Sequence, residues 1–261
     1  MLTSQRKQYL MDALRRDGRI VATTMSAALN VSEDTIRRDL RELAKEGLLQ
    51  RVHGGALPAS PALADFATRH GIATADKAAI GRAAAALVQP GQVVFVDGGT
   101  TCAQLVRALP RHLRATVVTH SPSIAMALMD HPDIEVIMLG GRLFRHSAVG
   151  VGAATLEAIA QIRADTYFMG VTSVHPDSGL STGDYEEACI KRALCHAAAE
   201  TIVLASSEKL ATASPYRIVG LSEISGIVVP AGTDEALLRP YRELGIALHV
   251  PPQPGQKDAT Q

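Results

Sequence analysis

Aromatic side chains are scarce in this 261-residue chain, which has no tryptophan and only 3% aromatic residues. Hydrophobic residues nevertheless amount to 47%, so alanine, valine and leucine must build the core, which is typical of an α/β protein. Long apolar runs are also absent, and none approaches the roughly 20 residues that span a membrane. Residues 1–19 mix charged and polar side chains, so we expect no signal peptide.

Cysteine is rare as well. Cys102, Cys189 and Cys195 form neither a CxxC motif nor an even set, which favours free thiols in a reducing, cytoplasmic environment. The histidines and cysteines show no metal-ligand spacing, and the GxxxxGK and GxGxxG motifs that bind nucleotides are missing. We therefore expect no metal and no cofactor, neither ATP nor NAD, and we find no internal repeat.

The chain carries no net charge, but its charges are distributed unevenly. Residues 1–57 hold 10 Lys and Arg against 7 Asp and Glu, whereas the remainder holds 16 against 19. Contacts to DNA phosphates need positive charge, so a nucleic-acid contact belongs to the N-terminal part. The acidic remainder limits nonspecific wrapping of DNA around the rest of the protein.

The stretch Val31–Ala56 predicts a helix followed by a basic hairpin. Ser32 is a suitable N-cap, and Ile36, Leu40 and Leu43 form one buried stripe at helical spacing. Residues of the exposed face and of the hairpin are the predicted DNA contacts: Ser32, Thr35, Arg37, Arg38, Arg41, Arg51, His53 and Gly54.

Two further helices are expected before this stretch, over residues 2–16 and 20–29. Together the three helices and the hairpin predict a winged helix-turn-helix that reads double-stranded DNA. A merely solvated helix face is the alternative explanation for Arg37 and Arg38. The basic hairpin at the right distance favours DNA binding.

After the hairpin, residues 58–61 contain two prolines and are expected to be a semi-rigid linker. Residues 62–88 are expected to be mostly helical, with a break near 71–74. Seven short apolar strands then alternate with helices, which predicts a parallel sheet covered on both faces: 92–96, 115–118, 134–139, 166–169, 202–205, 227–229 and 247–250. The predicted divisions are a DNA-binding domain 1–57, a connecting segment 58–75, a second domain 76–250 and a loose tail 251–261.

The first strand runs into Asp97-Gly98-Gly99-Thr100-Thr101 and then a helix. Glycines let the backbone approach an anion, threonine hydroxyls donate, and the helix N-terminus is positive. The turn is therefore a candidate phosphate cradle, although such turns are often only tight connections. Because ligands bind beyond the carboxyl ends of parallel strands, the candidate effector site comprises Asp97, Gly98, Gly99, Thr100, Thr101, Thr119, His120, Gly141, Asp184, Glu187, Lys191 and Lys209.

Three of these residues follow a loop at 179–184 and share one helix face. Asp184, Glu187 and Lys191 lie at i, i+3 and i+7. The carboxylates suit sugar hydroxyls and the ammonium suits a phosphate. The alternative is a solvated face with a weak ion pair between Glu187 and Lys191.

The string Val31-Ser32-x-x-Thr35-Ile36-Arg37-Arg38-Asp39-Leu40, followed by Gly47-Leu48-x-x-Arg51-x-His53-Gly54-Gly55-Ala56, resembles the signature of the DeoR family of bacterial transcription regulators. Further matching pieces are Asp97-Gly-x-Thr-Thr, Gly140-Gly141, Gly179-Leu180, Asp184-x-x-Glu187-Ala188-x-x-Lys191 and Lys209. The resemblance covers residues 3 to about 250. It implies a C-terminal domain with the fold of ribose-5-phosphate isomerase and glucosamine-6-phosphate deaminase, used as a sensor of phosphorylated sugars.

Two positions depart from the family pattern. The family usually has Asn where this chain has His120, and Asp in the turn after the fifth strand where this chain has Ser206. Both positions lie where a ligand would be read. We expect His120 at the rim of the ligand site, where it could donate to a phosphate; the alternative is an ordinary surface residue.

The expected function is a repressor of carbohydrate-metabolism genes whose affinity for operator DNA is controlled by a phosphorylated sugar. One monomer reads a half-site, so a homodimer or homotetramer is expected. The alternative is a sugar-phosphate isomerase or deaminase fused to a DNA-binding domain. Isomerisation needs a base, and enzymes resembling this fold carry carboxylates after a central strand. Residues Met169–Val174 contain none, which favours sensing. A third interpretation is a DNA-binding protein with an inert body.

Overall fold

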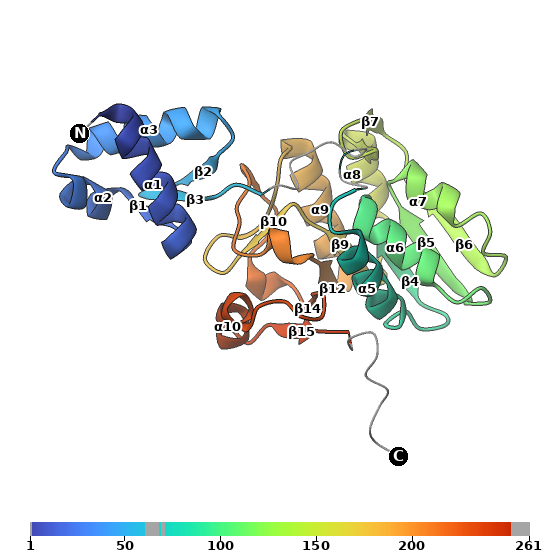
Figure 1. Cartoon of the computed structure of the whole chain (residues 1–261). Helices are drawn as coiled ribbons and strands as arrows, with labels where there is room; N and C mark the ends of the chain where they lie inside the picture. Colours follow the sequence, from blue (N-terminus) through green and yellow to red (C-terminus); the bar gives the residue numbers. More distant parts are fainter. Residues whose placement is uncertain (1, 61–67, 69–70, 252–261) are drawn as a thin grey trace, which may run out of the picture.

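The computed structural model describes residues 2–60, 68 and 71–251. A small N-terminal body precedes a larger α/β body, and the strand β3 leads from one to the other (Figure 1). The elements of the N-terminal body are α1 (Thr3–Asp17), β1 (Ile20–Val21), α2 (Ala22–Leu29), α3 (Glu33–Lys45), β2 (Leu49–Val52) and β3 (Gly55–Pro58). These form a winged helix-turn-helix, as the sequence predicts.

Helix α3 has the predicted construction. The Ser32 hydroxyl accepts the Thr35 amide at 3.2 Å, and Ile36, Leu40 and Leu43 are buried among the side chains of the other helices. Burial of this stripe fixes which face of α3 points outward. The predicted helix over 20–29 is wrong at its start, because Ile20 and Val21 pair with β3 and complete a three-stranded wing sheet.

The α/β body is built on a seven-stranded parallel sheet in the order β15-β14-β12-β9-β4-β5-β6. Its strands are β4 (Val93–Val96), β5 (Ala115–Thr119), β6 (Ile134–Met138), β9 (Ala164–Gly170), β12 (Ala198–Leu204), β14 (Gly226–Val228) and β15 (Ala247–His249). The chain proceeds outward from β4 through β5 to β6, and outward from β9 through β12 to β15. The strand order therefore reverses between β4 and β9, where such sheets bind ligands.

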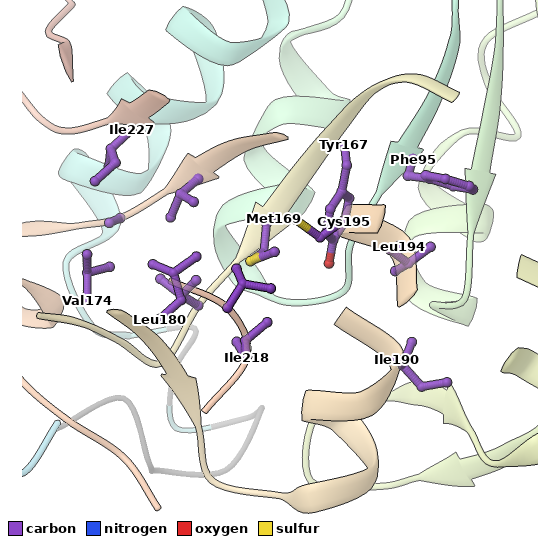
Figure 2. Packing of buried hydrophobic residues seen from close by; sticks show 14 of the residues in the cluster. Phe95, Tyr167, Met169, Val174, Leu180, Ile190, Leu194, Cys195, Ile218 and Ile227 are labelled. Atoms are coloured by element: carbon purple, nitrogen blue, oxygen red, sulfur yellow. The ribbon is translucent and has the colours of Figure 1, made fainter. Parts of the chain in front are cut away.

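Helices cover both faces of the sheet, as predicted. The helices are α5 (Thr74–Ala85), α6 (Thr100–Ala108), α7 (Pro122–Ala127), α8 (Ala153–Ala160), α9 (Tyr185–Ala197) and α10 (Glu235–Glu243). Alternate residues of one strand enter different cores: Val94 packs in the cluster with α5, α6 and α7, and Phe95 in the cluster with α8, α9 and α10. Figure 2 shows the cluster that includes α8, α9 and α10, in which Phe95 and Tyr167 of the sheet lie near Leu194 of α9.

Short antiparallel strands are the elements that the sequence interpretation missed. They are β7 (Arg142–Phe144), β8 (Val149–Val151), β10 (Ser173–His175), β11 (Gly179–Thr182) and β13 (Tyr216–Arg217). The loop expected at 179–184 is therefore wrong over its first four residues, which pair with β10 and β13. Their pairing partners are distant or short, so local periodicity gives no signal for them.

The predicted linker is not a free spacer. Ala59 forms a parallel bridge with Ala213, and the Ser60 hydroxyl donates to the Thr172 carbonyl at 2.5 Å. Both contacts tie the chain after β3 to the α/β body. The expected helix before residue 71 lies largely outside the described residues, as does the expected tail after Pro251.

No helix in the described residues is long and apolar enough to cross a membrane.

Candidate functional site

The predicted cradle lies where the strand order reverses. Strand β4 ends at Val96, Asp97 follows, and α6 begins at Thr100. Gly99 is the N-cap of α6 at φ 110°, a conformation that L side chains rarely adopt. Gly98 packs so closely on Val149 that a Cβ atom there would lie 2.2 Å from a methyl carbon. Both glycines are therefore needed for the tight turn that connects β4 to α6.

One hydroxyl in the cradle lacks a partner. Thr101 is 3% exposed, and its Oγ1 has no hydrogen-bond partner among the residues that the structure describes. Buried polar atoms are nearly always hydrogen-bonded. This hydroxyl lies in the first turn of α6, beside amides that attract anions, so it is a candidate donor to a bound group.

A buried charge network lies beneath the cradle. Lys191 of α9 is in contact with Asp97 Oδ2 and donates to the Gly170 carbonyl at 2.9 Å. The amide of Gly170 donates to the same carboxylate at 3.0 Å. His120 lies 2.9 Å from Asp97 Oδ1. Asp97 therefore joins the carboxyl ends of β4 and β9 to a helix on the far face of the sheet.

His120 lies in this network and not at the ligand rim, so that expectation is wrong. Its Nε2 faces Asp97, and its Nδ1 lies 2.8 Å from the Gly150 carbonyl. Both partners are acceptors, and the tautomer decides which ring nitrogen donates. The side chain is fully buried, and it holds Asp97 against β8.

The network shifts the ionisation of its members. Burial alone would raise the pKa of Asp97, but Lys191 and His120 together hold that pKa well below its usual range. Burial alone would lower the pKa of Lys191, but Asp97 and Glu187 raise it above its ordinary value. Both groups therefore stay charged at neutral pH. The alternative of a solvated Glu187–Lys191 face is wrong, since both side chains are buried.

A polar pocket adjoins this network. Seven of the predicted site residues line it: Gly98, Gly99, Thr100, Thr101, Glu187, Lys191 and Lys209. The glycines and threonines supply amides and hydroxyls, and the lysines supply positive charge. These convergent polar groups are of the kind that orient a small molecule in a binding site.

The other predicted site residues do not line the pocket, and most have structural contacts. Asp97 and His120 belong to the buried network. The Thr119 hydroxyl accepts the Ser121 amide, and Asp184 caps α9 by accepting the Glu187 amide at 2.9 Å. Gly141 packs against β8 and Thr155 at φ 144°.

The sequence interpretation missed several lining residues: Ile72, Lys77, Ser147, Gly170, Val171, Thr172 and Glu208. Lys77 is the most informative of them, since it is a lysine that is 3% exposed. Ser206 does not line the pocket, but its hydroxyl donates to Glu208 at 2.6 Å. A carboxylate thus reaches the pocket two residues after the position of the missing Asp.

The predicted DNA-contact residues lie together on the N-terminal body. Arg37, Arg38 and Arg41 are exposed on α3, and Arg51 and His53 are exposed on the wing. Arg37 is paired with Glu33 at 2.7 Å, whereas Arg38 lies 3.9 Å from Glu42 and its side chain is 76% exposed. Behind this face, Arg6 binds Asp39 with two hydrogen bonds and fixes α1 to α3.

A winged helix-turn-helix joined to an α/β body with a polar pocket is the architecture of a ligand-responsive, DNA-binding regulator. Comparison with protein families agrees: residues 6–61 match the DeoR-like helix-turn-helix domain, and residues 72–231 match the DeoR C terminal sensor domain. The chain therefore belongs to the DeoR family of DNA-binding transcription regulators.

Individual relatives match along nearly the whole chain. The putative aga operon transcriptional repressor of Escherichia coli O157:H7 is 31% identical, covering 94% of this chain and 92% of that one. The glycerol-3-phosphate regulon repressor of Escherichia coli K12 is 30% identical over 96% and 100%. Among solved structures, the sorbitol operon regulator SorC of Klebsiella pneumoniae is 14% identical, with a TM-score of 0.43 over 87% and 96% of the two chains.

Proposed function

We propose that this protein is a repressor of carbohydrate-metabolism genes whose affinity for operator DNA is set by a phosphorylated sugar. The observation that carries the proposal is the buried Thr101 hydroxyl without a partner among the described residues. A phosphate oxygen at the N-terminus of α6 would accept from this hydroxyl and from the adjacent amides. Such an oxygen would provide the Thr101 hydroxyl with an acceptor.

The rest of the pocket suits the other parts of such a ligand. Lys77, Lys191 and Lys209 bring positive charge for a phosphate. The Glu187 and Glu208 carboxylates can accept from sugar hydroxyls, and the Thr172 hydroxyl can accept or donate.

The names of two relatives support repression as the mode of control. Two of them are named as repressors, and one of these is named for the glycerol-3-phosphate regulon. Their identity to this chain is near 30%, so the particular sugar is left to experiment. We also propose that the protein acts in the cytoplasm as a homodimer or homotetramer, because one winged helix-turn-helix reads only a half-site.

We propose further that the pocket binds its ligand without turning it over. An isomerase needs a base beside the substrate carbonyl. The residues that follow β9, Val171–Val174, include no carboxylate, and Glu187 is already engaged by the Thr182 hydroxyl at 3.0 Å and by Lys191 at 3.5 Å. Glu208 is the remaining carboxylate in the lining, and it accepts from Ser206.

The test measures operator binding by fluorescence anisotropy, with DNA from upstream of the gene, against a panel of pentose, hexose and glycerol phosphates. We expect one of them to change operator affinity, and Thr101→Val to weaken its binding about ten-fold or more while leaving operator binding without ligand unchanged. Thr116→Val, at a half-buried position of β5 that does not line the pocket, is the matched control.

Two outcomes would overturn the proposal. If no phosphorylated compound binds in a calorimetric screen, the C-terminal body is inert toward them. If a bound compound is converted efficiently to its isomer or deaminated product, the protein is an enzyme, and Glu208→Gln would identify the base.

A further inference from the structure

The pocket lies across the carboxyl ends of three neighbouring strands. The cradle with Thr101 follows β4, Gly170 ends β9 and Glu208 follows β12, and all three residues line the pocket. These strands are adjacent in the order β12-β9-β4. Because neighbouring strands lie about 4.8 Å apart, the ends of β4 and β12 are separated by about 10 Å. A sugar phosphate spans a similar length, so a ligand with its phosphate on the cradle brings its other end towards Glu208.

Glu208 presents a carboxylate that is held on one side only. The fully buried Ser206 donates its hydroxyl to Glu208 Oε1 at 2.6 Å. In the part of the chain that the structure describes, Oε2 of the same carboxylate has neither a hydrogen bond nor an ion pair. A carboxylate accepts hydrogen bonds and does not donate them. Oε2 is therefore available to accept from a hydroxyl of the ligand.

The charges near Glu208 disfavour a second anionic group at this end of the pocket. Asp76 Oδ2 of α5 lies 3.5 Å from the hydroxyl of Ser207, the residue before Glu208, so a second carboxylate is close by. The neighbouring cation Lys209 already has an interaction of its own. A phosphate placed beside these carboxylates would be repelled. At the other end, by contrast, the N-terminus of α6 attracts an anion.

We propose that Glu208 determines the specificity of the pocket, by accepting from a hydroxyl at the end of the ligand opposite its phosphate and by repelling a second phosphate there. The ligand is then a sugar monophosphate with a free hydroxyl at its far end, and sugar bisphosphates are rejected. The proposal rests on the proposed function in placing a phosphate on the cradle. Specificity is a difference between two affinities, and an unfavourable charge contact with the wrong ligand creates it as effectively as a good contact with the right one.

The test measures the affinity of the full-length protein for matched pairs of ligands by calorimetry. The probes are fructose 6-phosphate with fructose 1,6-bisphosphate, and ribulose 5-phosphate with ribulose 1,5-bisphosphate. The variants are Glu208→Gln, Ser206→Ala and the control Glu200→Gln, which removes the same charge from an exposed position near the other end of β12. Thermal unfolding checks that each variant is folded.

We expect the wild type to bind a monophosphate about ten-fold or more tightly than the bisphosphate of the same sugar. Glu208→Gln should bring the two dissociation constants to within about three-fold of each other, mainly by tightening the bisphosphate, because the amide keeps an acceptor but removes the charge. Ser206→Ala should retain the preference, since the carboxylate remains. Glu200→Gln should bind both members of a pair as the wild type does.

The inference is overturned if the wild type binds a bisphosphate as tightly as its monophosphate, or if Glu208→Gln retains the wild-type preference. It is also overturned if Glu200→Gln changes the preference as much as Glu208→Gln, because the effect would then come from the overall charge of the protein. Failure of the proposed function looks different: the wild type would bind no phosphorylated probe at all, and the inference would fall with it.

Discussion

At the scale of single residues, His120 explains one departure from the family pattern. Its ring spans two acceptors that belong to different strand ends, the Asp97 carboxylate at 2.9 Å and the Gly150 carbonyl at 2.8 Å. The Gly150 amide donates back to the His120 carbonyl at 2.7 Å. The side chain therefore contacts Asp97 beneath the cradle and does not line the pocket.

Replacing His120 by alanine should destabilise the protein by about 1–3 kcal/mol, because a buried hydrogen bond of the ring to Asp97 or Gly150 is lost. His120→Asn should cost less, since its amide can still donate to one of them. Urea unfolding at neutral pH measures both. The role assigned to His120 is wrong if the alanine variant unfolds at the wild-type urea concentration, and His53→Ala, at an exposed histidine of the wing, is the control.

The site was predictable in part from the sequence. Gly98 to Thr101 follow a strand and open a helix, and this local pattern places them correctly. Lys77 gave no such signal, because it lies in an alanine-rich helix and reaches the pocket only through the packing of α5 on α6. Membership of a pocket depends on tertiary contacts, which a local pattern does not contain.

At the scale of elements, long periodic segments were predictable and short paired strands were not. Helix α3 shows its buried stripe within 13 residues, and the parallel strands alternate regularly with helices. By contrast, β1 has two residues and depends on β3, which lies more than 30 residues away. Such a strand is stabilised by pairing with its neighbour, so its own sequence does not predict it.

The N-cap of α3 provides a stability test at this scale. Ser32→Ala should lower the free energy of unfolding by about 1 kcal/mol, because the Thr35 amide loses its acceptor. Urea unfolding of the full chain measures this loss. Ser4→Ala, at an exposed position inside α1, is the matched control. Equal unfolding midpoints for Ser32→Ala and the wild type would contradict the capping role.

The exposed face of α3 provides a binding test. Arg38→Ala should weaken operator binding by about 1–3 kcal/mol if the guanidinium reads a base, with loss of discrimination at one position. If the guanidinium contacts a phosphate instead, the slope of the logarithm of the binding constant against the logarithm of the salt concentration becomes shallower by about one. Anisotropy titrations at several salt concentrations separate the two. Arg82→Ala, exposed on α5 in the other body, should bind the operator normally, and wild-type binding by Arg38→Ala would exclude this face as the reading surface.

At the scale of the whole molecule, the stability of the fold depends on pH through buried titratable side chains, among them His175 and Asp97. His175 of β10 accepts the Asp177 amide through Nδ1, and burial lowers its pKa despite the opposing charge of Asp177. The pKa of Asp97 is held well below its usual range. In both cases the unfolded chain binds a proton more readily than the folded chain, so acid favours unfolding.

The two groups act in different pH windows. Since the folded pKa of His175 is depressed, its contribution is present above about pH 6.5, the unfolded value, and is lost as the pH falls through the folded value. The contribution of Asp97 is present above about pH 3.9 and is lost as the pH falls further. The raised pKa of Lys191 has the opposite sign, so its contribution is complete below about pH 10.4 and is lost above the folded value.

Urea midpoints measured across pH should therefore be flat between about pH 7 and 9, decline gently below about pH 6.5 and fall steeply below about pH 4. His175→Gln should remove the gentle decline, because glutamine keeps an acceptor for the Asp177 amide without titrating. Asp97→Asn should be less stable at neutral pH, by about 3–5 kcal/mol for a broken buried pair, but should flatten the steep fall. If His175→Gln retains the decline near pH 6, another group carries it, and the buried histidine does not link acid to unfolding.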